Sequence, residues 1–420
     1  MSIFRTFQQL EVQTRRSFLL LFSISLLFWI GLTTLLPTLP SYTQKLGASH
    51  QEVGFVMGAF AIGLLASRVW LGRLVDRRSR RVALLIGTFV GMTAPLGYLF
   101  GHTVPLLMAI RAFHGVSVAA FTTGFSVLVV DLAPIKQRGE LIGYMSLAVP
   151  VGMALGPALG GYVEIALGYD VLFTLAALLT AVAFVLTWLI VEPPRAPLDT
   201  AHTQTNRPLN RTLGELLWSR SLLIPSLVLL LVGFVFGNLA TFLPLFMKEI
   251  PLTINVGLFY TVAAMTSFMA RVWTGQASDQ YGRGVFITGS LVSYILAMVL
   301  LAQTTTVDLF LLAAALEGIG AGVLIPMTIA LISDRSSMAE RGRVFAVCVS
   351  GFDVGIALAG PLFGFAQYWL GLRGLFWLTS LLAGGALLLF LGQSNPNLGS
   401  SWRFALAQEK DLYQVQQGES

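Results

Sequence analysis

Apolar runs of about 20 residues recur along nearly the whole chain, separated by short polar segments. A helix of this length crosses the ~30 Å hydrocarbon core of a bilayer, where backbone polar groups must be paired within helices or closed barrels. Only 11% of the 420 residues are charged, against about 25% in soluble proteins. Such a chain cannot cover a surface that faces water, and we expect an all-α integral membrane protein.

The runs predict twelve membrane-spanning helices, six on each side of a polar segment that contains several prolines. We expect two pseudo-symmetric six-helix bundles, residues 1–192 and 221–392, with a linker at 193–220 and a polar tail at 393–420. The expected spans are residues 17–37, 51–72, a third that ends near 101, 104–130, 140–163, 170–191, 221–246, 254–275, 285–302, 307–332, 344–367 and 374–391.

The distribution of basic residues predicts how the chain crosses the membrane. The net charge of +6 could suggest a nucleic-acid partner, but the basic residues lie in short loops between apolar runs. Lys45, Lys248 and Arg373 are the only ones in loops on the side away from the termini. Positively charged loops stay in the cytoplasm, so we expect cytoplasmic N- and C-termini. The compact loops and short tails suit a multi-pass protein of the bacterial inner membrane.

Other classes of function find no support in the sequence. The single cysteine, Cys348, excludes an internal disulfide and a metal site built from cysteines. The sequence shows no nucleophile triad, metal-ligand spacing or phosphate-binding loop. We therefore expect no enzymatic activity, no metal and no bound cofactor.

One segment occurs twice, 203 residues apart. Arg, Val, Trp, Gly and Asp have the same spacing from Arg68 to Asp76 as from Arg271 to Asp279. Asp131, followed by Arg138-Gly139, likewise corresponds to Asp334, followed by Arg341-Gly342. Each half therefore follows one plan, as internal repeats do in many transporters.

The first copy carries Gly72, Asp76, Arg77 and Arg80, and the second carries Gly275, Asp279 and Arg283. These residues resemble the signature Gly-x-Leu-x-Asp-Arg-x-Gly-Arg-Arg of the major facilitator superfamily, although Ser79 stands where a glycine is usual. The resemblance implies the major facilitator fold. We interpret the motif as a gate, in which a carboxylate held by an arginine or a helix N-terminus stabilises a closed state. The alternative is a basic loop that only sets topology.

Gly152, Gly156 and Gly160 form a stripe of small residues at four-residue spacing on the fifth span, with Pro157 and Gly161 beside them. This pattern resembles the helix-five motif of the twelve-helix drug:proton antiporters, and the resemblance implies export. Small residues let helices approach closely in lipid, so the stripe could support a rocking motion or ordinary tight packing.

Four ionisable residues within the spans are candidates for proton coupling or for the wall of a cavity: Arg111, His114, Glu317 and Asp353. Charges in spans are rare and often functional. The resemblance implies that Arg111 takes part in proton coupling or in a cavity network, whereas a structural role would have it bond backbone carbonyls. Burial disfavours a charged carboxyl group, so Glu317 and Asp353 could exchange protons, but Asp353 could instead form a salt bridge.

These features predict a secondary transporter that opens a central cavity alternately to each side of the membrane. We expect a monomer in the lipid bilayer that exports a small organic, amphipathic compound in exchange for protons, with the proton gradient as energy source. Export of a sugar or metabolite on the same scaffold is the alternative. A membrane sensor without transport is a third reading.

Overall fold

A computed structural model describes residues 10–77, 79–134, 137–192, 219–252, 254–336 and 341–414. Within these ranges all regular secondary structure is helical. Most of the expected linker, residues 193–218, lies outside them. The chain forms two compact units, one comprising Met1–Leu198 with Asn255–Thr261 and the other Asp199–Ile254 with Val262–Ser420.

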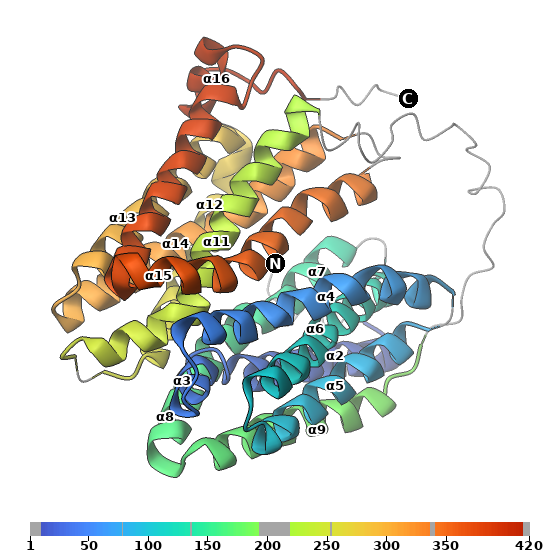
Figure 1. Ribbon diagram of the computed structural model, residues 1–420. Coiled ribbons are helices and arrows are strands. Elements are labelled where there is room, and N and C mark those ends of the chain that lie inside the picture. Colours follow the sequence, from blue (N-terminus) through green and yellow to red (C-terminus); the bar gives the residue numbers. More distant parts are fainter. Residues whose placement is uncertain are drawn as a thin grey trace. The chain divides into compact units, whose positions relative to one another are not determined.

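The two units have closely similar sets of helices (Figure 1). The first unit contains α2 (Val12–Thr33), α3 (Leu39–Lys45), α4 (His50–Arg77), α5 (Arg80–Phe100), α6 (Val104–Leu132), α7 (Arg138–Ser146), α8 (Ala148–Leu167) and α9 (Tyr169–Trp188). The rest of the chain contains α11 (Arg220–Glu249), α12 (Gly257–Tyr281), α13 (Arg283–Gln303), α14 (Val307–Asp334), α15 (Arg341–Gln393) and α16 (Leu398–Ala405).

The described helices account for the twelve expected spans. Ten stretches are long and apolar enough to cross a membrane. The last of them, Cys348–Gln393, has 46 residues and is interrupted at Gly371, where φ is 68°, so it supplies two crossings. With α12, which is 25 residues long, the total is twelve.

Several predicted boundaries were wrong at helix ends. Helix α2 begins at Val12 and not near residue 17, so Arg15 and Arg16 belong to its first turns. Helix α4 continues to Arg77, beyond the predicted end at Gly72. Long arginine side chains can reach the interface while their backbone stays helical, so a basic residue does not mark the end of a helix. The predicted plain tail, residues 393–420, begins with the last residue of α15 and contains α16.

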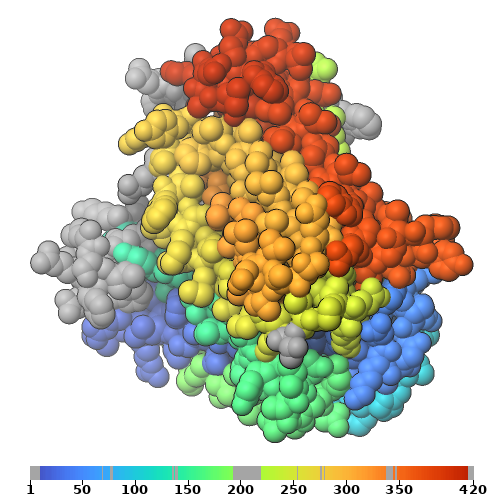
Figure 2. Space-filling view, turned by 90° about the vertical axis from the view of Figure 1, so that its left-hand side faces the viewer, coloured from blue at the N-terminus to red at the C-terminus, as the bar shows by residue number. Residues whose placement is uncertain are grey.

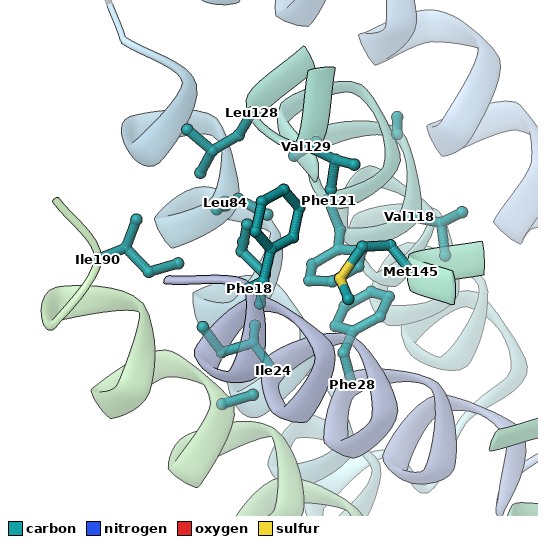
Figure 3. Packing of buried hydrophobic residues seen from close by; sticks show 14 of the residues in the cluster. Phe18, Ile24, Phe28, Leu84, Val118, Phe121, Leu128, Val129, Met145 and Ile190 are labelled. Carbon is teal, nitrogen blue, oxygen red and sulfur yellow. The ribbon is translucent and has the colours of Figure 1, made fainter. Parts of the chain in front are cut away.

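Corresponding helices pack together in both units. In the first, α2 packs on α8 and α9, α4 on α6, and α5 on α6 and α9. In the second, α11 packs on α15, and α13 on α14 and α15. Figure 3 shows the apolar core of the first unit, where Phe28 of α2 stacks on Phe121 of α6 with ring centroids 4.0 Å apart. Each unit thus positions its polar side chains on a packed helical frame.

Candidate functional site

An ion pair occurs at the start of the third membrane-spanning helix of each half. We call α5 and α13 the third helices, and α6 and α14 the fourth helices. In the first half, Arg80 Nε lies 2.8 Å from Asp131 Oδ2, at the end of α6. In the second, Arg283 Nε lies 3.5 Å from Asp334 Oδ2, at the end of α14. Arg283 lies 203 residues after Arg80, and Asp334 lies 203 residues after Asp131, which is the repeat distance. The duplicated sequence therefore produces a duplicated contact.

The other gate-motif residues lie on the helices that precede these pairs. Gly72 is in α4, with open space where a side chain would lie. Asp76 and Arg77 are also in α4, and Gly275 and Asp279 are in α12. The surroundings of these four residues are outside the described part of the structure. Their role as a gate stays a prediction.

The third helices begin differently in the two units. Ser79 has extended backbone and its side chain accepts a hydrogen bond from the Val82 amide, 3.1 Å away. Glu192 bonds the same helix start, accepting from the Ser79 hydroxyl at 2.9 Å and from the Arg81 amide at 2.7 Å. The residue 203 positions later, Gly282, has φ 87° and ψ 154°, a region almost restricted to glycine. The departure at Ser79 from the signature glycine thus has a structural reason, because a capping side chain replaces a turn that needs glycine.

The glycine stripe of the helix-five motif packs against α2. A side chain at Gly152 would meet Trp29, one at Gly156 would meet Thr33, and one at Gly160 would overlap the carbonyl oxygen of Thr34. Across this contact the Thr33 hydroxyl donates to the Gly152 carbonyl, at 3.0 Å. Pro157 and Gly161 are also buried in α8. We call this contact the α2–α8 seam.

The second unit has its own close contact, between α11 and the first half of α15. Gly233 of α11 lies against the Phe352 carbonyl, and Gly355 of α15 lies against the Leu230 carbonyl. Glycines on both helices therefore produce the approach that the first unit achieves with a stripe on α8. We call it the α11–α15 seam.

Arg111 and His114 belong to a buried polar cluster in the first unit. The Arg111 guanidinium lies over the Phe60 ring, 4.3 Å from its centroid, and its Nε has no hydrogen-bond acceptor among the described residues. A hydrogen bond of 3.2 Å joins His114 Nδ1 to the Tyr98 hydroxyl. The Tyr98 side chain also lies beside Arg111. The two predicted candidates are therefore brought together, and Tyr98 is a member that the sequence did not reveal.

Glu317 lies 203 residues after His114, at the corresponding position of the repeat. It is buried in α14, with 6% of its surface exposed, and neighbouring Gly318 packs on α12 at Ala263. Tyr294 of α13 is within electrostatic reach of both Glu317 and Arg271. Arg271 itself donates from Nε to the Gly322 carbonyl of α14, at 3.2 Å. A buried tyrosine thus lies beside ionisable groups in each unit.

Asp353 differs from Glu317 in its surroundings. It is in the first half of α15 and is only partly buried, and it has an interaction partner. The structure therefore does not bring Asp353 and Glu317 into equivalent environments.

A second buried arginine, which the sequence analysis did not single out, binds the tail. Arg335 contacts Asp411 through Nε at 2.7 Å and Nη2 at 3.0 Å. It also donates to the carbonyl oxygens of Ser221, at the start of α11, and Ser394, just after α15. The Arg335 side chain has no exposed surface. Figure 2 shows the red tail segment over one end of the second unit's yellow and orange helices.

The signal for this arrangement was weak in the sequence. Helix α16 has only eight residues, too few for a span, and Arg335 and Asp411 are 76 residues apart with no local pattern between them. An Asn397 capping box at the start of α16 was the one local sign of a helix there.

The chain is similar to known proteins in both sequence and fold. A family model described as Major Facilitator Superfamily matches residues 21–307 and 256–408. The quinolone resistance protein NorA of Staphylococcus aureus (strain MRSA252) is 24% identical over 295 residues, which cover 68% of this chain and 73% of NorA. Alignments with NorA of other strains cover 46% of its length. Multidrug resistance protein 1 of Bacillus subtilis (strain 168) is 32% identical over 171 residues, covering 40% of this chain and 43% of that protein.

Solved structures share the fold at low identity. A bacterial homologue of the human lysosomal transporter Spinster superposes with a TM-score of 0.74 at 15% identity, covering 97% of this chain and all of the other. A D-xylose–proton symporter gives a TM-score of 0.73 at 18% identity, over 90% and 97% of the two chains. With the family model matched across both repeated halves, this chain belongs to the Major Facilitator Superfamily and is a multi-pass membrane transporter of small molecules, not an enzyme.

Proposed function

We propose that this transporter exports a small amphipathic organic compound from the cytoplasm in exchange for protons. It works as a monomer in a bacterial inner membrane, with both termini in the cytoplasm, and uses the proton gradient without a bound cofactor. The two bundles open a central cavity alternately to each side. Relatives named for quinolone and multidrug resistance support a drug-like substrate.

The α2–α8 seam is the observation that carries the proposal of export. Its glycines are those of the helix-five antiporter motif, and they bring α8 against the backbone of α2 at Thr34. Helices in such contact can slide or rock, because the glycines give α8 a smooth surface where it faces Trp29, Thr33 and Thr34. The Thr33 hydroxyl bond to Gly152 is a single polar link that can break and re-form during the cycle.

Glu317 is our proposed proton carrier. Water cannot solvate the charged form of a buried carboxyl group, so burial favours the form that holds a proton. Its place in α14 corresponds to that of His114 in α6, beside the buried Arg111. We propose that Arg111 and His114 also take part in proton coupling or in the network that lines the cavity. Asp353 is the second candidate carrier.

The sugar-export alternative would make polar groups such as Asn238, Thr241 and Gln51 matter more for transport than aromatic side chains. Asn238 is fully buried, and its amide donates to the Thr379 hydroxyl at 3.4 Å. Thr241 is 2% exposed. The Oδ1 atom of Asn238 has no hydrogen-bond partner among the described residues, and Gln51 is exposed at the start of α4.

The test is proton movement in energised inside-out vesicles that contain the full chain. Lipophilic cations, fluoroquinolones and sugars are added in turn, and a fluorescent dye reports the internal pH. We expect an amphipathic drug to release protons from vesicles with the parent protein. Glu317→Gln should abolish this release, whereas Asp353→Asn should leave it measurable.

Equal amounts of inserted protein must be present in each preparation. If sugars alone release protons, the substrate class is wrong. If Asp353→Asn abolishes the response while Glu317→Gln retains it, the carrier is misassigned. If no compound acts on abundant folded protein, the proposal of proton-coupled efflux fails.

A further inference from the structure

A groove opens on the surface of the first unit between α2 and α9. Its volume is about 360 Å³, and its walls are mostly apolar, with Leu19 and Leu20 from α2 and Leu186 from α9. Val12, Arg15 and Arg16 lie toward one end and Ser23 at the other. These residues follow the three- and four-residue spacing of one helix face. From Arg15 to Ser23 the groove extends about 12 Å along the helix axis.

The two arginines at this end of the groove carry charge that no carboxylate of the described residues neutralises. In the part of the chain that the structure describes, neither Arg15 nor Arg16 forms an ion pair with a carboxylate. The acidic group one turn away, Glu11, is exposed at the start of α2. One carboxylate beside two guanidinium groups leaves this end of the groove positive.

Aromatic and basic side chains indicate the depth of this end in the membrane. Trp188 ends α9 two residues after Leu186, and 56% of its surface is exposed. The guanidinium of Arg81 lies over its ring, 5.3 Å from the centroid. Tryptophan concentrates at the level of lipid headgroups. The arginine end therefore lies where phosphates of lipids are found, and the leucine walls extend toward the hydrocarbon.

We propose that this groove binds one anionic phospholipid from the surrounding bilayer. The phosphate lies between Arg15 and Arg16, and an acyl chain follows Leu19, Leu20 and Leu186. Arginine recognises phosphate oxygens with paired hydrogen bonds, and basic pockets between membrane helices hold lipid headgroups. A zwitterionic lipid has the same acyl chains but lacks the net charge, so the site discriminates by headgroup.

Native mass spectrometry of the full chain in detergent tests this proposal, with phosphatidylglycerol as the probe. Phosphatidylethanolamine and glycerol phosphate are titrated in parallel. We expect phosphatidylglycerol to bind most tightly, and we expect Arg15→Gln with Arg16→Gln to weaken its binding about 30-fold. Leu19→Ser changes a side chain that is 55% exposed. It should weaken the binding of phosphatidylglycerol, but the protein should still prefer phosphatidylglycerol to phosphatidylethanolamine by the same factor. Glu11→Gln should strengthen it.

Arg220→Gln is a control for the loss of a surface charge, because Arg220 is exposed at the start of α11, the first helix of the other half. It removes one positive charge and leaves the groove intact, so phosphatidylglycerol should bind as to the parent. Thermal unfolding of each variant confirms that it is folded. Equal binding of phosphatidylglycerol and phosphatidylethanolamine, equal loss in Arg220→Gln, or unchanged binding in the double variant would overturn the proposal. Binding of glycerol phosphate as tight as that of the whole lipid would also overturn it, since the leucine walls would then contribute nothing.

Discussion

The two halves of this transporter start their third helix at corresponding residues but by different means. In the first half, Ser79 caps α5 with its own side chain and Glu192 accepts hydrogen bonds from the same turn. In the second half, Gly282 makes a turn with φ 87° before α13. Beside that turn, the Phe404 carbonyl of the tail lies against Gly284. The tail thus packs on the start of α13. At the corresponding start of α5, the Glu192 carboxylate accepts the hydrogen bonds instead.

The two halves share two specific contacts between helices. Both keep the ion pair between the third and fourth helices, Arg80 with Asp131 and Arg283 with Asp334. Both also keep a glycine on the fourth helix against the second, Gly115 on Phe60 and Gly318 on Ala263. The repeat therefore preserves contacts that set the distance and register of helices.

What differs is the chemistry inside that frame. At one repeat position the first half has His114 and the second has Glu317. The neighbouring tyrosines, Tyr98 of α5 and Tyr294 of α13, are not at corresponding positions of the repeat, where Leu301 would match Tyr98. Duplication supplied the same backbone twice, and substitution then gave one half a basic cluster and the other a buried carboxyl group.

The largest test of this comparison is removal of the tail's carboxylate. Asp411→Ala leaves Arg335 buried without a counter-charge, which should lower the free energy of unfolding by about 3–5 kcal/mol. Glu192→Ala, the corresponding loss in the first half, should lower it by about 1–2 kcal/mol, because a cap and not a buried ion pair is lost. Thermal unfolding of the purified proteins in one detergent measures both.

A double variant separates the buried charge from the packing of the tail. Arg335→Met with Asp411→Leu replaces the ion pair by apolar side chains and should recover most of the stability lost in Asp411→Ala. If Asp411→Ala lowers the free energy of unfolding no more than Glu192→Ala does, the contact between the tail and Arg335 stabilises the protein no more than Glu192 does.

The second test compares the two seams. Gly160→Ala would overlap the Thr34 carbonyl and Gly355→Ala the Leu230 carbonyl, so both should force helices apart. We expect each to lose about 3 kcal/mol, the upper end for an overpacked core. Gly384→Ala is the control, because open space surrounds Gly384 in the same fold. Thermal unfolding gives the stabilities, and drug-dependent proton release then shows whether only the α2–α8 seam is needed for transport. Two seam variants as stable as Gly384→Ala would contradict the close contacts.

The sequence could predict those parts of the structure that depend on the length of apolar runs, on regular residue spacing or on the internal repeat. Run length indicated the spans, and four-residue spacing indicated the stripe of Gly152, Gly156 and Gly160 on one face. The helix that receives this stripe, and the residue Thr33 that bonds across it, could not be inferred because packing partners leave no local pattern. Tyr98 and Arg335 were missed for the same reason. A single buried tyrosine or a basic residue after a span looks the same in sequence whatever it contacts.

The smallest effects come from exchanging the two helix starts. Gly282→Ser forces a side chain onto a backbone with φ 87° and should lower the free energy of unfolding by about 1–2 kcal/mol. Ser79→Gly loses a cap and the hydrogen bond to Glu192, and should lower it by about 1 kcal/mol. Ser79→Thr, which keeps a hydroxyl, is the control and should remain close to the parent in thermal unfolding. If Gly282→Ser is as stable as the parent, α13 can begin with a serine cap as α5 does. Backbone geometry would then not explain why the two halves differ at this position.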